Sequence, residues 1–164
     1  MSASQIRVFN TMVQDKVPLT PLTPGKLGVY VCGPTVYSYI HIGNARTFTS
    51  FDTIVRYLRY RGFEVTYVRN YTDVDDKIIK AAKETGEDPI ALADRFVKEF
   101  EHDVGQLRLL KPDVSPKVSE TIPEIVALIE KLIARGVAYE SKGDVYIEVR
   151  KYDGYLTLSK RKLD

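Results

Sequence analysis

Tryptophan is absent from the 164-residue sequence, cysteine occurs once and histidine occurs twice. A single cysteine excludes an intrachain disulfide framework and is typical of a protein from a reducing compartment. The scarcity also limits metal chemistry, because zinc is held mainly by thiolates and imidazoles. Only Cys32, His41 and His102 carry such groups. His102 stands between Glu101 and Asp103 in an expected helix, so we expect its side chain to be solvated.

Long apolar runs are also missing. The sequence has no stretch long enough to span a membrane, and its N-terminus lacks the apolar core of a secretory signal. We therefore expect a cytoplasmic protein without membrane contact. The net charge of +2 gives no strong signature of a dedicated nucleic-acid binder. The length fits one domain, which can bury roughly 70% of its unfolded surface.

Neither common nucleotide-binding fingerprint, GxGxxG or GxxxxGK[ST], occurs in the chain. Two other short motifs occur instead, CGPT at residues 32–35 and HIGN at residues 41–44. They lie between an apolar stretch at 27–31 and a region whose apolar residues recur at helical spacing and which ends near Gly62. Connections from the carboxyl end of a strand into a helix are where open α/β sheets bind ligands. The free N–H groups and positive dipole of a helix start suit a phosphate.

The order of the expected elements predicts an α/β fold that begins as the first half of a doubly wound, Rossmann-like parallel sheet. A helical insertion and a terminal β-hairpin follow. Residues 111–116 are predicted to be a linker because they contain two prolines. We expect strands at 6–9, 27–33 and 64–70, helices starting after residue 41 and covering 73–84, 89–107 and 121–136, and the hairpin at 139–149.

Three blocks closely resemble the cysteinyl-tRNA synthetases, a family of class I aminoacyl-tRNA synthetases. They are residues 32–37 (CGPTVY), 41–48 (HIGNARTF) and 68–79 (VRNYTDVDDKII). The HIGN tetrapeptide is similar to the first class I signature, HIGH, with Asn44 at its last position. The resemblance runs from about residue 8 to the end of the chain.

The resemblance implies a class I synthetase fold with two segments. Residues 1–88 would be the N-terminal half of the nucleotide-binding catalytic fold. Residues 89–164 would be a helical segment and the start of the connective insertion. The rest of the catalytic domain and the tRNA-binding domains would be absent, so we expect an incomplete fragment that is inactive alone. Half a doubly wound sheet would leave apolar surface uncovered, which favours self-association.

By the same resemblance, the family activates cysteine with ATP and Mg²⁺ to cysteinyl-adenylate and transfers it to tRNA(Cys). His41 and Asn44 would be catalytic, and both would bind the nucleotide together with Gly43. Gly33 and Thr72 would contact the amino acid. Two structural alternatives stay open: His41 as a residue that bonds its own helical turn, and Thr72 as the cap of the helix that follows it.

A lone cysteine at a strand end is most often a small buried hydrophobic residue. The resemblance instead implies that Cys32 is a zinc ligand and that the zinc binds the substrate thiolate. Such a metal prefers sulfur to a hydroxyl, and an apolar pocket alone would reject serine only by roughly 10–200-fold. The other zinc ligands of the family are missing from this chain.

Two other functions stay open. One is a cysteine ligase that acts on an amino-sugar, which would share the zinc and adenylation sites. The other is a non-catalytic, truncated paralogue that serves as a binding module. Residues 70–79 and the insertion that runs to residue 164 favour the tRNA enzyme.

Overall fold

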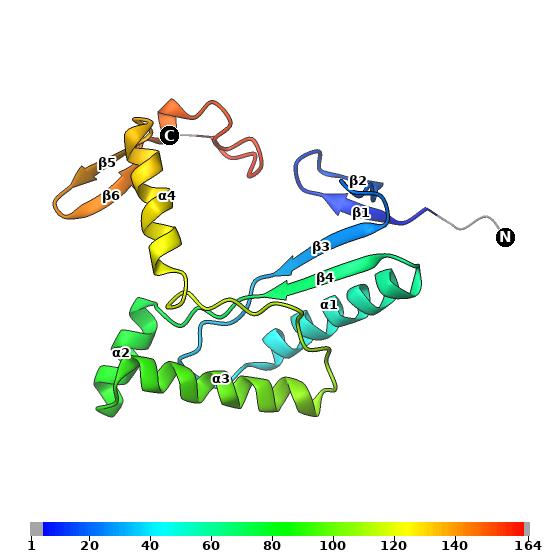
Figure 1. The fold of residues 1–164 in the computed structure, drawn as a ribbon, viewed down its shortest axis with the longest axis horizontal. Coiled ribbons are helices and arrows are strands. Elements are labelled where there is room, and N and C mark those ends of the chain that lie inside the picture. Colours follow the sequence, from blue (N-terminus) through cyan, green and yellow to red (C-terminus); the bar gives the residue numbers. More distant parts are fainter. Residues whose placement is uncertain (1–4, 163–164) are drawn as a thin grey trace. The chain divides into compact units, whose positions relative to one another are not determined.

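The computed structural model describes residues 5–162 (Figure 1). The chain forms two compact units. The larger is Pro21–Ile122, and the smaller combines the described residues that precede Pro21 with those that follow Ile122. None of the helices in the described part has the length and apolar character that crossing a bilayer requires.

A pair of parallel strands forms the centre of the larger unit. Strands β3 (Lys26–Val31) and β4 (Glu64–Arg69) pair in register, with Val31 opposite Arg69. Parallel strands need a long crossover, which here contains helix α1 (Ile42–Tyr60). The buried side chains of α1 follow the helical period and face the core: Phe48, Asp52, Val55 and Leu58.

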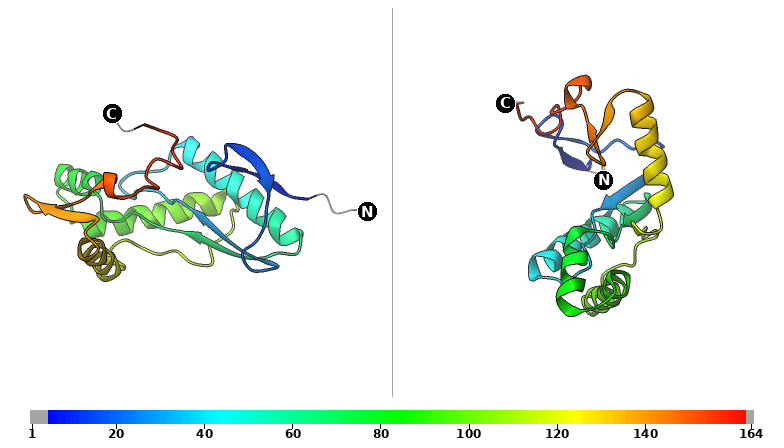
Figure 2. Two further views of the ribbon diagram at one scale, coloured as in Figure 1. Left: turned by 90° about the horizontal axis from the view of Figure 1, so that it is seen from above. Right: turned by 90° about the vertical axis from the view of Figure 1, so that its left-hand side faces the viewer.

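Two further helices complete the larger unit, and Figures 1 and 2 show α1 and α3 on the same side of the β3–β4 pair. Helix α2 (Asp76–Thr85) ends at Gly86, whose φ of 72° is the left-handed conformation that glycine adopts without strain. Helix α3 (Pro89–Gln106) begins at the Asp88 cap with proline in its first turn. Phe100 of α3 packs edge-on against Phe48 of α1, with 5.2 Å between ring centroids.

The predicted linker pairs along the outer edge of β4. Asp113 N donates to Tyr67 O (2.8 Å) and Arg69 N donates to Val114 O (3.1 Å). Tyr71 N then donates to Pro116 O (2.8 Å), and the bridges are parallel. Residues 113–118 therefore act as a third extended segment. Pro116 does not interrupt the pairing, because the edge strand needs only some of its own N–H groups.

The structure excludes the alternative in which Thr72 caps the following helix. Helix α2 starts later, and its cap is Asp75, whose carboxylate accepts from Lys77 N at 2.8 Å. Thr72 forms instead a parallel bridge with Thr35. Asp73, expected in a first helical turn, is buried and accepts hydrogen bonds from the backbone N–H and the hydroxyl of Ser119.

The smaller unit contains short elements with little buried surface. The predicted first strand is present. It pairs antiparallel with a second strand, which the sequence analysis missed. A second antiparallel pair turns at Gly143, where φ is 87°, and α4 has no fully buried side chain. The elements are β1 (Arg7–Asn10), β2 (Asp15–Pro18), α4 (Ile122–Ala134), β5 (Ala138–Ser141), β6 (Asp144–Ile147) and the 3₁₀-helix η1 (Val149–Lys151).

The predicted boundary at residue 88 falls inside the larger unit, between α2 and α3. Compactness does not report which residues carry catalytic function. The functional division into 1–88 and 89–164 therefore stays a prediction.

Candidate active site

The carboxyl ends of β3 and β4 lie side by side, and the chain remains paired beyond them. Val36 N donates to Thr72 O (3.2 Å), and Thr72 N donates to Pro34 O (3.1 Å). These bonds tie residues 32–36 to residues 70–72. The predicted substrate residues Gly33 and Thr72 thus lie at the same edge of the sheet, where open α/β sheets bind ligands.

Gly33 contacts Asn70 so closely that no side chain fits. Its N–H donates to Asn70 Oδ1 at 2.8 Å, and a Cβ atom on Gly33 would lie 1.6 Å from the Asn70 carbonyl oxygen. The sequence analysis missed Asn70. Its position at the last residue of a predicted strand, opposite the glycine that ends the parallel neighbour, was the signal that could have identified it.

His41 and Asn44 form a reciprocal cap at the start of α1. His41 Nδ1 accepts from Gly43 N at 3.1 Å, and Asn44 Oδ1 accepts from His41 N at 3.1 Å. His41 therefore does bond its own helical turn, as the structural alternative had it. A neutral imidazole that accepts at Nδ1 carries its proton on Nε2. Within residues 5–162, His41 Nε2 and Asn44 Nδ2 have no hydrogen-bond partner, so both are free donors on exposed side chains.

A pocket of about 230 Å³ lies at this helix start. It brings His41 and Asn44 together with Thr35, which is bridged to Thr72. Cys32, Gly33, Gly43 and Thr72 do not line it. The full lining is Pro34, Thr35, Tyr37, Ser38, Tyr39, Ile40, His41 and Asn44.

Two aromatic walls of this pocket are held by neighbouring helices. The Tyr39 ring meets Phe96 of α3 edge-on at 5.4 Å, and the Lys77 ammonium of α2 lies 6.0 Å from the Tyr37 ring centroid. Side chains distant in sequence therefore shape the space in front of His41. The sequence analysis missed both tyrosines, because no local pattern reports these contacts.

Cys32 is exposed, contrary to the reading of a lone cysteine as a buried hydrophobic residue. Among the described residues, its hydrogen-bond contact is a weak one to Gly33 O, at 3.8 Å from Sγ. His102 is exposed on α3. Across residues 5–162, no group of three His, Cys, Asp or Glu side chains is arranged to hold a metal ion. The described residues thus do not form a zinc site on their own.

Residues 18–164 match the family described as tRNA synthetases class I (C) catalytic domain. The chain belongs to this family. Within it, the chain is 58% identical over 160 residues to a cysteine–tRNA ligase of Anaeromyxobacter dehalogenans and 52% identical over 161 residues to one of Geobacillus thermodenitrificans. The alignments cover 97% and 98% of this chain but 33% and 34% of those proteins. The chain spans about a third of the length of these curated relatives.

A solved structure of another synthetase is similar in fold to this family member. It is a LeuRS of Agrobacterium radiobacter, in a ternary complex with tRNA and LeuAMS. The TM-score is 0.62 at 21% sequence identity, over 73% of this chain and 16% of the LeuRS chain. The chain therefore has a class I synthetase fold with mixed helices and strands.

Proposed function

We propose that this chain supplies the cysteine- and ATP-binding part of a cysteine–tRNA ligase. The enzyme would form cysteinyl-adenylate from cysteine and ATP·Mg²⁺ and transfer the cysteine to tRNA(Cys). One observation carries the proposal: the His41–Asn44 helix start presents two unbonded donors beside a pocket at the carboxyl end of the parallel strands. The cysteine–tRNA ligase relatives at 50–58% identity support it.

In the first step, a carboxylate oxygen of cysteine attacks the α-phosphorus of ATP, and the bond from that phosphorus to pyrophosphate breaks. The carboxylate is already ionised, so the step needs no protein base. Negative charge builds on the nonbridging oxygens in the transition state. His41 Nε2–H and Asn44 Nδ2 are the donors that would meet this charge, and preorganised donors of this kind act selectively on the transition state.

The charge distribution of α1 supports phosphate binding at its start. The helix has 19 residues and no acidic residue in its first turn, so its positive end is not neutralised. Helix α2, in contrast, has Asp75 as its cap and Asp76 in its first turn. Gly43 leaves the backbone at the helix start open to a close ligand.

The finer assignments belong to the same proposal. The β3–β4 pair would be the first half of a doubly wound sheet, with residues 1–88 as nucleotide fold and 89–164 leading into the insertion. Gly33 and Thr72 would contact cysteine. Cys32 would provide one zinc ligand, and because the described residues do not complete a zinc site, no catalytic step is assigned to the metal.

The test is a chimera in which residues 1–164 replace the aligned third of the Anaeromyxobacter dehalogenans cysteine–tRNA ligase. We expect cysteine-dependent exchange of pyrophosphate into ATP, with serine inactive. The 164-residue chain alone should neither charge tRNA nor retain stoichiometric zinc, because one thiolate is a quarter of the usual ligand set. An inactive chimera that folds and binds zinc would contradict the proposal.

A further inference from the structure

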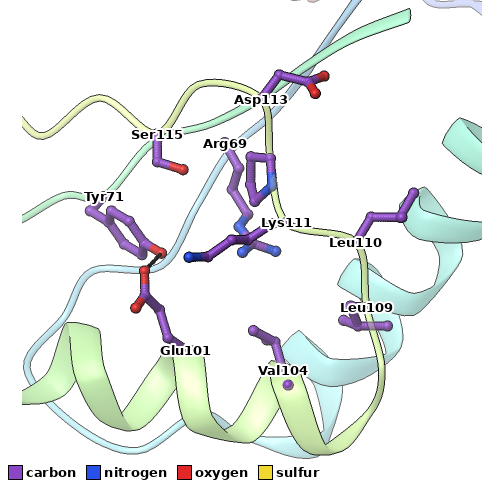
Figure 3. A pocket seen from close by; sticks show the side chains of 11 residues that line it. Arg69, Tyr71, Glu101, Val104, Leu109, Leu110, Lys111, Asp113 and Ser115 are labelled. Atoms are coloured by element: carbon purple, nitrogen blue, oxygen red, sulfur yellow. Dashed lines mark hydrogen bonds between the residues drawn. The ribbon is translucent and has the colours of Figure 1, made fainter.

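A second pocket, of about 410 Å³, lies between the end of β4, helix α3 and the chain that follows α3 (Figure 3). Its lining includes Arg69, Tyr71, Glu101, Val104 and Lys111, none of which lines the His41 pocket. All of these residues belong to the larger unit. The proposed function gives this pocket no role.

Arg69 is the unusual member of this lining. It is 2% exposed, and its Nε and Nη1 atoms are buried without a hydrogen-bond partner. Within the described residues no carboxylate lies within 4.0 Å of its guanidinium. The Phe48 and Phe100 rings lie 5.2 and 4.8 Å away, which offsets only part of the lost hydration. A buried cation without an anion is costly.

A second cation shares the pocket. Figure 3 shows the nitrogen ends of Arg69 and Lys111 directed into the same space. Lys111 is exposed and forms no ion pair with any other residue in the described part of the chain. The two positive groups repel each other, so a negative group between them would stabilise both.

The acidic groups of the pocket do not fill this role. Glu101 Oε1 accepts the Tyr71 hydroxyl at 3.2 Å. Burial, reinforced by the Glu101 charge, raises the pKa of Tyr71 to about 12, so this hydroxyl stays neutral and bonded. Asp113 Oδ2 is occupied by Arg59 Nη2 at 2.8 Å and Tyr67 N at 2.7 Å. Arg69 Nε and Nη1 and the Lys111 ammonium therefore have no partner among the described residues.

We propose that this pocket binds an oxyanion group, a phosphate or a carboxylate, between Arg69 and Lys111. A guanidinium is a planar fork that matches both groups, and an ammonium adds a point charge. The Ser115 hydroxyl also lines the pocket and can donate. The volume exceeds that of one phosphate ion, so the group can be carried on a small molecule.

The test uses inorganic phosphate and, separately, acetate and AMP, titrated into the 164-residue chain at constant ionic strength. Backbone amide NMR signals report the position of binding. We expect saturable shifts at Arg69, Tyr71 and Lys111 with at least one of these probes. AMP binding tighter than phosphate would identify a carried phosphate, and acetate binding alone would identify a carboxylate ligand.

Matched variants decide whether the two cations hold the anion. Lys111→Ala should weaken binding roughly tenfold, whereas Lys80→Ala removes the same charge from an exposed site on α2 and should leave affinity unchanged. Glu101→Gln should tighten binding several-fold, because it removes a negative charge that repels the bound anion. Equal affinity in both lysine variants, shifts confined to residues 41–44, or no shifts with any probe would overturn the proposal. None of these outcomes depends on cysteine activation.

Discussion

At the scale of single residues, Gly33 is the most constrained position in the candidate site. We predict that Gly33→Ala destabilises the chain by about 2–3 kcal/mol, because a Cβ 1.6 Å from Asn70 O must push the two chains apart. Gly28→Ala is the matched control on β3, since its Cβ would meet no atom within 4 Å. It should stabilise by roughly 0.5 kcal/mol. Urea unfolding of both variants checks this, and equal midpoints would contradict it.

Tyr71 gives the fold a dependence on alkaline pH. Its pKa rises from about 10 in the unfolded chain to about 12 in the folded one. A raised folded pKa means that the stabilisation is complete below pH 10 and is lost as the pH rises towards 12. We predict that the stability difference between wild type and Tyr71→Phe shrinks over this interval. Urea unfolding at pH 8 to 11.5 measures it, and a constant difference would show that Tyr71 titrates normally.

The site residues differ in how well the sequence predicted them. His41 and Asn44 stand together at the helix start because a short motif determines a local cap. For Thr72 the sequence left two roles open, a helix cap and a contact to the amino acid. The cap is excluded because Asp75, three residues later, caps α2 and Thr72 pairs with Thr35; the contact to the amino acid stays a prediction. Arg69 was overlooked, although alternation along the strand places it on the same face of β4 as the buried Val65 and Tyr67. A cation at a core-facing position is a signal in itself.

At the scale of elements, Asp113 fastens the chain after α3 to the sheet. Its Oδ2 accepts from Tyr67 N, a residue that is 1% exposed, and from Arg59 Nη2. We predict that Asp113→Ala costs about 2–3 kcal/mol, because a largely buried N–H loses its acceptor. The control is Glu64→Ala on β4, which breaks an exposed ion pair with Lys26 and should cost less than about 1 kcal/mol.

Thermal or urea unfolding of the two variants provides the comparison. If Asp113→Ala were no more destabilising than Glu64→Ala, the pairing of residues 113–118 with β4 would not depend on this carboxylate.

Elements with a strong apolar period were predicted to within a few residues. Helices α1 and α3 each place several buried side chains on one face, and this spacing is visible in the sequence. The pairing of residues 113–118 was not visible, because β4 and Asp113 hold the segment by backbone and carboxylate bonds rather than by apolar alternation. Strand β2 was missed for a similar reason: its four residues are polar or exposed apart from Val17.

At the scale of the whole molecule, stability is concentrated in the larger unit. Apart from Ala138, every buried apolar side chain in the described part of the chain lies between Val31 and Val104. We therefore predict that limited trypsin digestion cuts first within residues 123–162 and leaves a resistant core of about Pro21–Ile122. Mass spectrometry of the fragments measures this order. Early cuts between residues 31 and 104 would contradict this prediction.

Self-association through uncovered sheet surface stays a prediction.

We propose that His41 acts in adenylation as well as capping α1. His41→Ser keeps a capping side chain but loses the imidazole donor, whereas His41→Ala loses both. In the chimera, we predict that cysteine-dependent pyrophosphate exchange falls by about 10²–10³-fold in both variants, with kcat and kcat/KM lowered together. Only His41→Ala should also lose about 1 kcal/mol of stability. Near-normal exchange by His41→Ser would contradict this catalytic role and leave His41 as a cap alone.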